Sequence, residues 1–329
     1  MRILSGIQPS GRLHLGNYFG ALKQHVEMQE QHDCFYFIAN YHALTTVQDP
    51  KLLHEYTRGV ALDYLALGLD PNRVTFFRQS DVPEVTELTW ILNCVTGTGL
   101  LERAHAYKDK VAKGIASSMG LFCYPVLMAA DILIYKSQLV PVGRDQVQHV
   151  EMAQDMAGYF NTTFQCQVLV RPESKLGEAP VVPGVDGQKM SKSYNNTVEL
   201  FAEPKAAQKA IMSIKTDSTP VEDPKDPTSD NVFALLKLFA CEQETAEWDA
   251  RYRKGGMGYG EAKKRLFELF EERFAGPRAR RAELLADPSY VDDVLREGGK
   301  KARKVARQTM AEVLAACGLA TSRLEMPAK

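Results

Sequence analysis

Residues 2–29 read RILSGIQPSGRLHLGNYFGALKQHVEMQ and hold a short apolar run, a glycine-rich turn and a segment of helical period. The run from Arg2 to Ile7 predicts a strand, and Tyr18 to Gln29 predicts a helix. Glycines 6, 11 and 16 lie at and after the strand, where backbone N–H groups and a helix N-terminus can face a phosphate. A plain tight strand-to-helix connection would suit the same glycines, because such turns are weakly specific.

Strand and helix patterns keep alternating through the first half of the chain. Apolar runs recur at Asp33 to Ala39, Val74 to Gln79 and Leu139 to Val142, and Leu52 to Leu67 has a helical period. Alternation of this kind is typical of strand–helix–strand units around a parallel sheet. We therefore expect a parallel sheet in this half.

The strand signals stop at about Val198, and helical patterns replace them. Apolar residues at three- to four-residue spacing predict helices at Pro204 to Ile214, Asn231 to Ala240, Gly260 to Phe274 and Val291 to Cys317. The Pro, Asp, Ser and Thr content of residues 216–230 predicts a loop. We expect an α/β protein with a Rossmann-type parallel-sheet catalytic domain in residues 1–193, followed by an all-helical domain in residues 194–329.

The bulk composition is that of an ordinary globular protein, with 45% hydrophobic and 25% charged residues. Forty basic and 41 acidic residues leave a net charge of −1, so nucleic-acid binding has to be argued from local patches. The six cysteines contain no C-x-x-C pair, which fits a reducing compartment better than a zinc site or a disulfide framework. No apolar run approaches the ~18 residues of a membrane span, and the N-terminal run is too short for a signal peptide. We expect a cytoplasmic protein.

The pentapeptide Lys189-Met-Ser-Lys-Ser193 is a more specific signal. Two lysines three residues apart on a loop can reach the phosphates of a nucleotide and stabilise the charge that builds as pyrophosphate leaves. A solvated basic loop is the alternative. A chance match to one given pentapeptide in a chain this long has a probability of roughly one in ten thousand, which favours the nucleotide loop.

Residues 121–135, LFCYPVLMAADILIY, form an almost wholly apolar run with one carboxylate, Asp131. Pro125 is well placed to open a helix, on which Met128 and Asp131 would share a face. A carboxylate among apolar side chains requires a hydrogen-bond donor. The indole N–H of a bound tryptophan is one such donor. A neighbouring Arg, or exposure at the helix edge, is the structural alternative.

Together these motifs resemble the class I aminoacyl-tRNA synthetases over essentially the whole chain. His14-Leu-Gly-Asn17 stands where the family has His-Ile-Gly-His, and Lys189 to Ser193 matches its Lys-Met-Ser-Lys-Ser loop. The Asn at the last position is typical of the members for tryptophan, and residues 124–133 are similar to their tryptophan-binding helix. Tyr290 to Met310 is similar to the family's terminal helix.

The resemblance implies catalytic roles for Lys189, Lys192 and Asn17, and ATP with Mg²⁺ as substrate. The implied ATP site consists of Gln8, Pro9, Ser10, His14, Gly16, Asn17, Gly143, Arg144, Asp145, Val182, Lys189, Met190, Ser191, Lys192 and Ser193. Arg144 departs from the family, whose tryptophan members usually carry Glu in this Gly-Glu-Asp-Gln block.

The resemblance also implies an L-tryptophan site. Its residues are Leu4, Gly6, His42, Tyr124, Met128, Asp131, Val140, Val142 and Gln146. Asp131 would bind the indole nitrogen, while Met128 and Tyr124 shape the ring pocket. Leu4 stands where close relatives often have an aromatic residue. A lone His after a strand is often structural, so His42 enters the site through the resemblance alone.

The implied partners are tRNA(Trp) and a second copy of the chain, with Leu88 to Leu101, including Trp90, as a candidate homodimer interface. Two basic runs could contact tRNA phosphates or form solvated faces. They are Lys300, Lys301, Arg303, Lys304 and Arg307, and Arg278, Arg280 and Arg281. We expect no iron–sulfur cluster, because the helical half offers only Cys241 and Cys317 as ligands.

Three other functions remain open at this point. A tyrosine-specific synthetase would share the nucleotide loops but would need a site for a phenol. A synthetase-like paralogue could bind tryptophan or a protein partner without charging tRNA, although the intact Lys189, Lys192 and Asp131 argue against it. A small nucleotidyltransferase of the same superfamily predicts no helical domain of this size.

Overall fold

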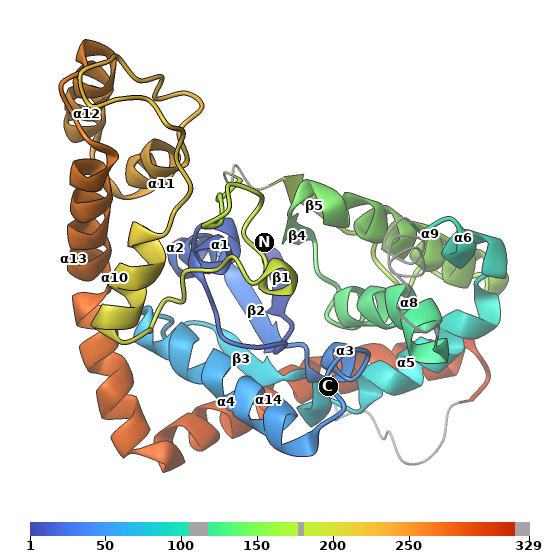
Figure 1. Ribbon diagram of the computed structural model, residues 1–329. Helices are drawn as coiled ribbons and strands as arrows, with labels where there is room; N and C mark the ends of the chain where they lie inside the picture. The colour runs from blue at the N-terminus through green and yellow to red at the C-terminus, as the bar shows by residue number, and fades with distance from the viewer. Residues whose placement is uncertain (105–117, 177–180, 320–329) are drawn as a thin grey trace.

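A computed structural model describes residues 1–104, 118–176 and 181–319 of the chain. Its sheet has five parallel strands in the order β3-β2-β1-β4-β5 (Figure 1). They are β1 (Arg2–Ile7), β2 (Asp33–Ile38), β3 (Thr75–Arg78), β4 (Leu139–Val142) and β5 (Glu173–Leu176). The first four confirm the predicted strands. The sequence ESKL of β5 was not predicted, because its mostly exposed residues leave no apolar run.

The strand order reverses at the centre of the sheet, between β1 and β4. From β1, the chain adds β2 and β3 on one side and then returns to add β4 and β5 on the other. In open parallel sheets, ligands bind beyond the carboxyl ends of the strands at such a reversal. The topology therefore places the candidate site next to the ends of β1 and β4.

Helices cover both faces of the sheet. Between and around the strands lie α1 (Leu15–Asn17), the π-helical η1 (Tyr18–Leu22), α2 (Lys23–Met28), α3 (Asn40–Ala43), α4 (Pro50–Ala66), the 3-10 turn η2 (Gln79–Asp81), α5 (Glu84–Val95), α6 (Thr98–Glu102), α8 (Met119–Ile134), η3 (Arg144–Gln146) and α9 (Val147–Thr163). The second half holds η4 (Lys192–Tyr194), α10 (Pro204–Met212), α11 (Asn231–Phe239), α12 (Glu242–Lys254), α13 (Tyr259–Ala286) and α14 (Pro288–Ala316). Residues 213–230 contain neither helix nor strand, which confirms the loop predicted for residues 216–230.

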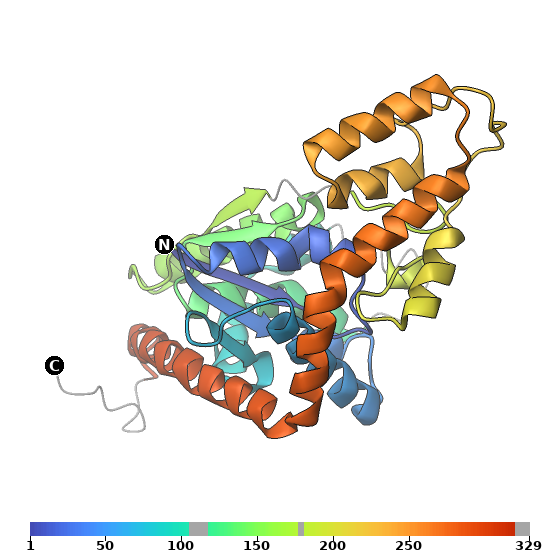
Figure 2. The same cartoon turned by 90° about the vertical axis from the view of Figure 1, so that its left-hand side faces the viewer.

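Successive strand residues point to opposite faces and so feed two separate hydrophobic clusters. Ile3, Tyr36 and Phe76 belong to the cluster that contains the buried side of α4. Their neighbours Leu4, Phe35 and Phe77 belong to the cluster that contains α5, α8 and α9. Figure 2 shows α10 to α12 and the first part of α13 extending away from the sheet. Among the described residues, no helix is long and apolar enough to cross a membrane.

The helix around Asp131 differs from its prediction at the start. Pro125 lies inside α8, which begins at Met119 instead. Ser118 caps this helix, and its side chain accepts a hydrogen bond from the N–H of Leu121. A polar cap about two turns upstream of Pro125 thus sets the start, and Pro125 removes only one internal N–H. The helix α12 was not predicted, and α13 continues beyond Phe274 to Ala286.

The last helix, α14, follows the helical half in sequence, but it packs against the strand β3 and the helix α5 of the first half. Arg303 and Arg307 both reach Glu84 of α5, with Nε to Oε1 distances of 2.7 and 3.0 Å. We therefore propose an amended division, in which residues 194–286 form the helical domain and residues 288–316 return to the catalytic domain. Helical periodicity could not predict the packing of α14 on the catalytic domain, because it indicates which face of a helix is apolar but not which element packs against that face.

Replacing Gly298 with Ala is expected to destabilise the protein by about 1–3 kcal/mol, the usual cost of overpacking. A Cβ at this position would lie 1.7 Å from the carbonyl oxygen of Phe76, because α14 meets the backbone of β3 directly. In the matched control Gly59→Ala, inside α4, nothing lies within 4 Å of the new Cβ. We expect that control to melt at or above the wild-type temperature in a thermal denaturation scan. Equal melting temperatures for the two variants would contradict the close approach.

Candidate functional site

A cavity of about 490 Å³ lies at the carboxyl ends of β1 and β4. Its walls come from β1, β2, β4, η1, α2, α3, α8 and η3. The nine residues predicted for the amino-acid site all line it: Leu4, Gly6, His42, Tyr124, Met128, Asp131, Val140, Val142 and Gln146. Gln8 and Gly143, predicted for the nucleotide, line it too. The volume is within the range of small-molecule sites.

Several lining residues had not been predicted, among them Phe37, Ala39, Thr45 and Ile132. Phe37 explains why Gly6 is a glycine, since a Cβ at Gly6 would lie 2.7 Å from the ring. Phe37 belongs to a predicted strand, but the pattern could not show that its face meets the end of β1. This ring supplies an aromatic wall in a site where Leu4 is aliphatic.

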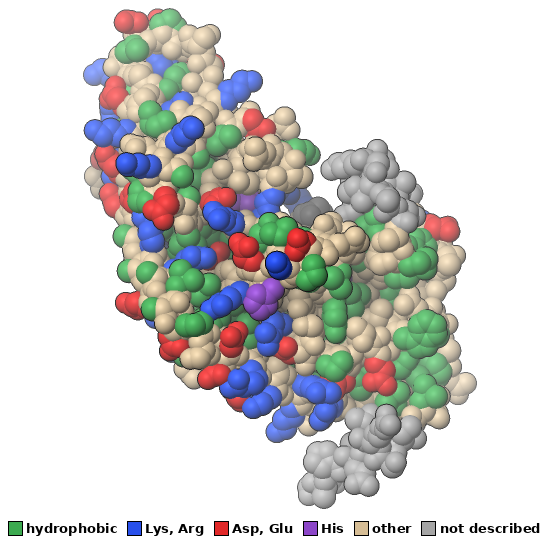
Figure 3. Space-filling model, turned by 60° about the horizontal axis from the view of Figure 1, so that its bottom comes forward, with side chains coloured by type: hydrophobic (Ala, Val, Ile, Leu, Met, Phe, Trp, Pro, Cys, Tyr) green, Lys and Arg blue, Asp and Glu red, His purple; other side chains and the backbone are tan. Residues whose placement is uncertain are grey.

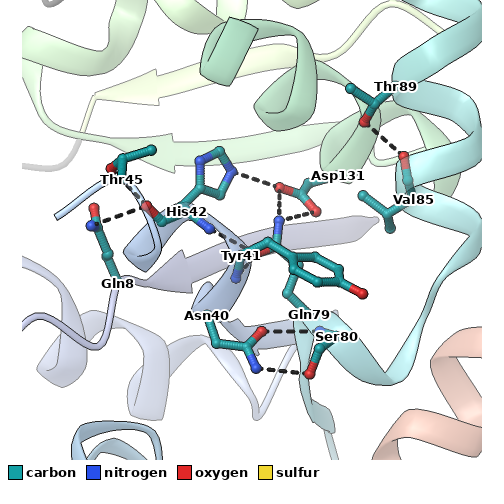
Figure 4. Close-up of polar contacts among 10 residues, drawn as sticks. All are labelled: Gln8, Asn40, Tyr41, His42, Thr45, Gln79, Ser80, Val85, Thr89 and Asp131. Carbon is teal, nitrogen blue, oxygen red and sulfur yellow. Dashed lines mark hydrogen bonds and ion pairs between the residues drawn. The ribbon is translucent and has the colours of Figure 1, made fainter. Parts of the chain in front are cut away.

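Asp131 is the buried carboxylate of the cavity, with 2% of its surface exposed. Nε2 of Gln79 lies 2.9 Å from Oδ1 and 2.8 Å from Oδ2, and Nε2 of His42 lies 3.0 Å from Oδ2 (Figure 4). Burial raises the pKa of Asp131, and the hydrogen bonds from His42 and Gln79 oppose that rise. In the part of the chain that the structure describes, Asp131 pairs with Gln79 and His42 and not with an Arg, so that structural alternative is wrong, and so is exposure at the helix edge.

A second polar group connects Tyr124 with Gln146 through His149 of α9. The hydroxyl of Tyr124 lies 2.6 Å from Nε2 of His149, and Nδ1 of His149 lies 3.0 Å from Oε1 of Gln146. If the ring donates through Nδ1 to that oxygen, Nε2 accepts from the hydroxyl. His149 is 1% exposed and was not predicted. Its position three residues after Gln146, on one helix face, is the only signal that could have found it.

The glycine-rich turn and the Lys-Met-Ser-Lys-Ser loop lie side by side. Lys192 Nζ donates to the carbonyl oxygen of Gly11 at 2.9 Å. A Cβ at Gly16 would lie 3.4 Å from Cβ of Met190, and His14 forms a backbone bridge with Glu199. Two segments more than 170 residues apart in sequence are thus brought together at one edge of the sheet.

The predicted nucleotide residues differ in their surroundings. Pro9, His14, Val182 and Met190 are buried, whereas Ser10, Gly143, Arg144, Lys189 and Ser193 are exposed. Oδ1 of Asn17 accepts the backbone N–H of His14 at 3.1 Å, and Oγ of Ser191 lies 2.9 Å from that of Ser193. Asp145 is part of η3, but its side chain lies outside what the structure describes.

Lys192 carries an unusual charge environment. Burial lowers the pKa of its ammonium group to about 8, and the negative charge of Asp63 on α4 opposes this shift. Burial, together with the charge of Lys192, lowers the pKa of His14 to about 4, so His14 is neutral at pH 7. Within the described residues Lys192 forms no ion pair, since its ammonium group donates to a carbonyl oxygen, and such a cation favours the binding of a negatively charged ligand.

Most arginines of the two basic runs form ion pairs or hydrogen bonds with other residues of the chain. Besides the pairs with Glu84, Nε of Arg281 lies 2.7 Å from Oδ1 of Asp63, and Nε of Arg280 donates to the carbonyl oxygen of Leu65 at 2.9 Å. Arg278 pairs with Glu271 and Lys300 pairs with Glu297. Arg280, Arg281, Arg303 and Arg307 hold α13 and α14 against α4 and α5. The pairs of Arg278 and Lys300 lie within α13 and within α14, and Lys300, Lys301 and Lys304 are exposed, as on a solvated face.

The comparisons with known proteins agree with one another. A family model described as tRNA synthetases class I (W and Y) matches residues 1–275. A protein of Rhodopirellula baltica named tryptophan–tRNA ligase is 57% identical over 320 residues, covering 97% of this chain and all of its own. Its namesake in Fusobacterium nucleatum is 52% identical, covering 97% of this chain and 98% of its own. The crystal structure of tryptophanyl-tRNA synthetase from Campylobacter jejuni, complexed with ADP and tryptophan, superposes with a TM-score of 0.91 at 51% identity and covers 97% of this chain and 100% of its own.

Proposed function

The chain belongs to the class I tRNA synthetases of the tryptophan and tyrosine family, and we propose how its own residues divide the work. Its reaction is the ATP-dependent ligation of L-tryptophan to tRNA. The tryptophan carboxylate attacks the α-phosphate of ATP, giving tryptophanyl-adenylate and pyrophosphate. The adenylate then acylates the 3′ end of tRNA(Trp) and releases AMP. The observation that carries the proposal is a buried carboxylate, Asp131, facing a cavity at the strand-order reversal.

Asp131 selects the indole. Its carboxylate is surrounded by apolar lining such as Met128, Ile132 and Phe37, and the indole N–H is the donor that the amino acid brings. A hydrogen bond to a charged group contributes ~1.5–3 kcal/mol, so a ring without the N–H is rejected by a similar amount. Tyr124 and Gln146, joined through His149, bind the polar backbone end of the amino acid.

The nucleotide binds between the glycine-rich turn and the Lys-Met-Ser-Lys-Ser loop. Lys192 exchanges its bond to the Gly11 carbonyl for a phosphate oxygen, and the exposed Lys189 adds a second charge. Both stabilise the negative charge that grows on departing pyrophosphate. Mg²⁺ enters with ATP, since it is usually held by substrate phosphates and few protein oxygens. General acid–base catalysis has little part, because positioning and charge dominate such transfers.

The helices α10 to α13 form the part that reads the anticodon of tRNA(Trp). They extend away from the sheet, as Figure 2 shows, and are connected to the active site through the segment that carries the Lys-Met-Ser-Lys-Ser loop. Four arginines of the two basic runs pair with carboxylates of the same chain, so we expect most contacts with tRNA phosphates to come from other basic side chains. The unpaired cysteines fit a cytoplasmic enzyme.

The enzyme acts as a homodimer that uses the surface around α5. Trp90 on this helix is 71% exposed, and a contiguous exposed hydrophobic patch is typical of a protein–protein contact. Figure 3 shows hydrophobic side chains gathered on the side of the molecule where α5 and α8 lie, whereas Lys and Arg alternate with Asp and Glu elsewhere on that face. Sedimentation velocity is expected to give twice the chain mass for wild type and a monomer for Trp90→Glu. A monomeric wild type would remove this part of the proposal.

The activity is tested by amino-acid-dependent pyrophosphate exchange with each of the twenty amino acids. We expect exchange with tryptophan alone, and its loss on chelation of Mg²⁺. Exchange with tyrosine would mean that the cavity has been misread. No exchange with any amino acid would favour a non-charging paralogue that only binds tryptophan.

A further inference from the structure

Among the described residues, Gln79 is the one whose side chain donates to both carboxylate oxygens of Asp131. Its Nε2 lies 2.9 Å from Oδ1 and 2.8 Å from Oδ2, and the side chain is 1% exposed. A donor between the two oxygens holds the carboxylate plane in one orientation. We propose that Gln79 is a positioning residue that aims Asp131 at the indole N–H, and so sets the selectivity of the site. This rests on the proposed function.

The amide of Gln79 can face only one way. Its Oε1 accepts the backbone N–H of Tyr41 at 3.0 Å and that of His42 at 3.4 Å. Since two N–H groups meet this atom, it has to be the oxygen, and the nitrogen faces Asp131. The backbone N–H groups of α3 therefore orient the Gln79 amide so that its nitrogen donates to Asp131 in the absence of a ligand.

The backbone that carries Gln79 is held as firmly as its side chain. It follows β3 directly, and β3 pairs with β2 in parallel so that Arg78 lies beside Ile38. Just beyond these ends, Asn40 Oδ1 accepts the N–H of Ser80 at 3.0 Å, and Asn40 Nδ2 donates to Ser80 Oγ at 2.7 Å (Figure 4). The conformational freedom that the Gln79 side chain would otherwise lose when tryptophan binds is therefore already lost in the folded protein.

A neutral donor suits this position better than a cation. An Arg would occupy both carboxylate oxygens with a fork of N–H groups and neutralise their charge. Gln79 uses one nitrogen, and His42 adds a single bond to Oδ2. An ionised carboxylate has about four acceptor positions, so acceptor capacity remains for the indole N–H.

The first test is Gln79→Met, which removes the donor and keeps an unbranched side chain of similar length. In pyrophosphate exchange, we expect the KM for tryptophan to rise about 10- to 100-fold, because a misaligned charged acceptor loses most of its hydrogen bond. The KM for ATP is expected to change by less than about twofold, since Asp131 belongs to the proposed tryptophan site and not to the proposed nucleotide site. The preference for tryptophan over phenylalanine should fall in parallel.

The matched control is Gln29→Met. Gln29 is also buried and also joins two backbone segments, donating to the carbonyl oxygen of Gly68 at 3.1 Å and accepting from the N–H of Asp70 at 2.8 Å. It does not line the cavity. We expect this variant to lose stability while its KM for tryptophan stays at the wild-type value.

A second variant, Gln79→Glu, tests the donor without removing the bonds to α3. The new carboxylate still accepts from Tyr41 and His42 but repels Asp131, so the KM for tryptophan should exceed that of Gln79→Met at neutral pH. When pH is lowered, the introduced carboxyl gains an O–H donor, and the KM should fall toward wild type. The other titratable groups nearby are His42 from α3, Tyr135 directly after α8 and, beside Tyr135, Glu84 from α5. Wild type measured over the same pH range accounts for them.

The proposal is overturned if folded Gln79→Met keeps the wild-type KM for tryptophan, or if its KM for ATP rises equally. It is also overturned if Gln29→Met reproduces the effect, or if Gln79→Glu shows no recovery at low pH. A wild-type protein that does not exchange with tryptophan would overturn the function as well, which separates the two failures.

Discussion

The variant Asp131→Asn is expected to raise the KM for tryptophan about 10- to 100-fold, which corresponds to the loss of ~1.5–3 kcal/mol from a charge-assisted hydrogen bond. The amide keeps the shape of the carboxylate but removes its charge, and its NH₂ group would face donors such as Gln79 Nε2 or His42 Nε2. The variant should accept phenylalanine more readily. In wild type, phenylalanine leaves a charged carboxylate without the indole N–H donor, and this cost is smaller for a neutral amide. Steady-state pyrophosphate exchange with both amino acids measures this.

The control for that variant is Asp33→Asn. Asp33 is an exposed carboxylate at the start of β2, where it pairs with Arg2, and so lies at the opposite end of the strands from the cavity. We expect wild-type kinetics from it. If Asp131→Asn retained both the KM and the preference for tryptophan, the indole would have to be recognised by other groups, and the role of Gln79 would be lost with it.

The variant Lys192→Ala is expected to lower the kcat of tryptophan activation about 10²- to 10³-fold, the usual effect of removing one group that stabilises transition-state charge. The KM for tryptophan should change little, because Lys192 lies at the glycine-rich turn and does not line the amino-acid cavity. Single-turnover formation of the adenylate measures the step directly. Lys205→Ala, on the exposed surface of α10, is the control and should be silent.

The pH profile gives an independent test of Lys192. Its pKa is lowered to about 8, so the ammonium form is present below that pH and is lost as the pH rises through it. The kcat/KM for ATP reports the free enzyme and should therefore fall above pH ~8. Bound phosphates favour the charged form, so kcat should persist to higher pH. If kcat/KM for ATP still fell above pH ~8 in Lys192→Ala, the decrease would have to come from the titration of another group.

Much of the candidate site was predictable because its signals are local. The order of strand, glycine-rich turn and helix in residues 2–29 predicted β1 and the turn after it, and the pentapeptide at 189–193 predicted a second loop for phosphates. A single carboxylate in the apolar run 121–135 predicted a buried acceptor at Asp131, and 2% exposure agrees with that. Periodicity and residue chemistry within segments of 5 to 28 consecutive residues are sufficient for such inferences.

Only the tertiary structure decided which residues from distant segments contact one another. Gln79 and Asp131 are 52 positions apart, and nothing local distinguishes Gln79 from another polar residue at the end of a strand. The sequence predicted a helix ending at Cys317, but its packing on β3 and the pairing of Arg303 with Glu84 depend on the order of the strands. Local patterns determine which face of an element is apolar and which residue types it offers. The choice of partner depends on the free energy of the whole packed arrangement, which brings together residues that are remote along the chain.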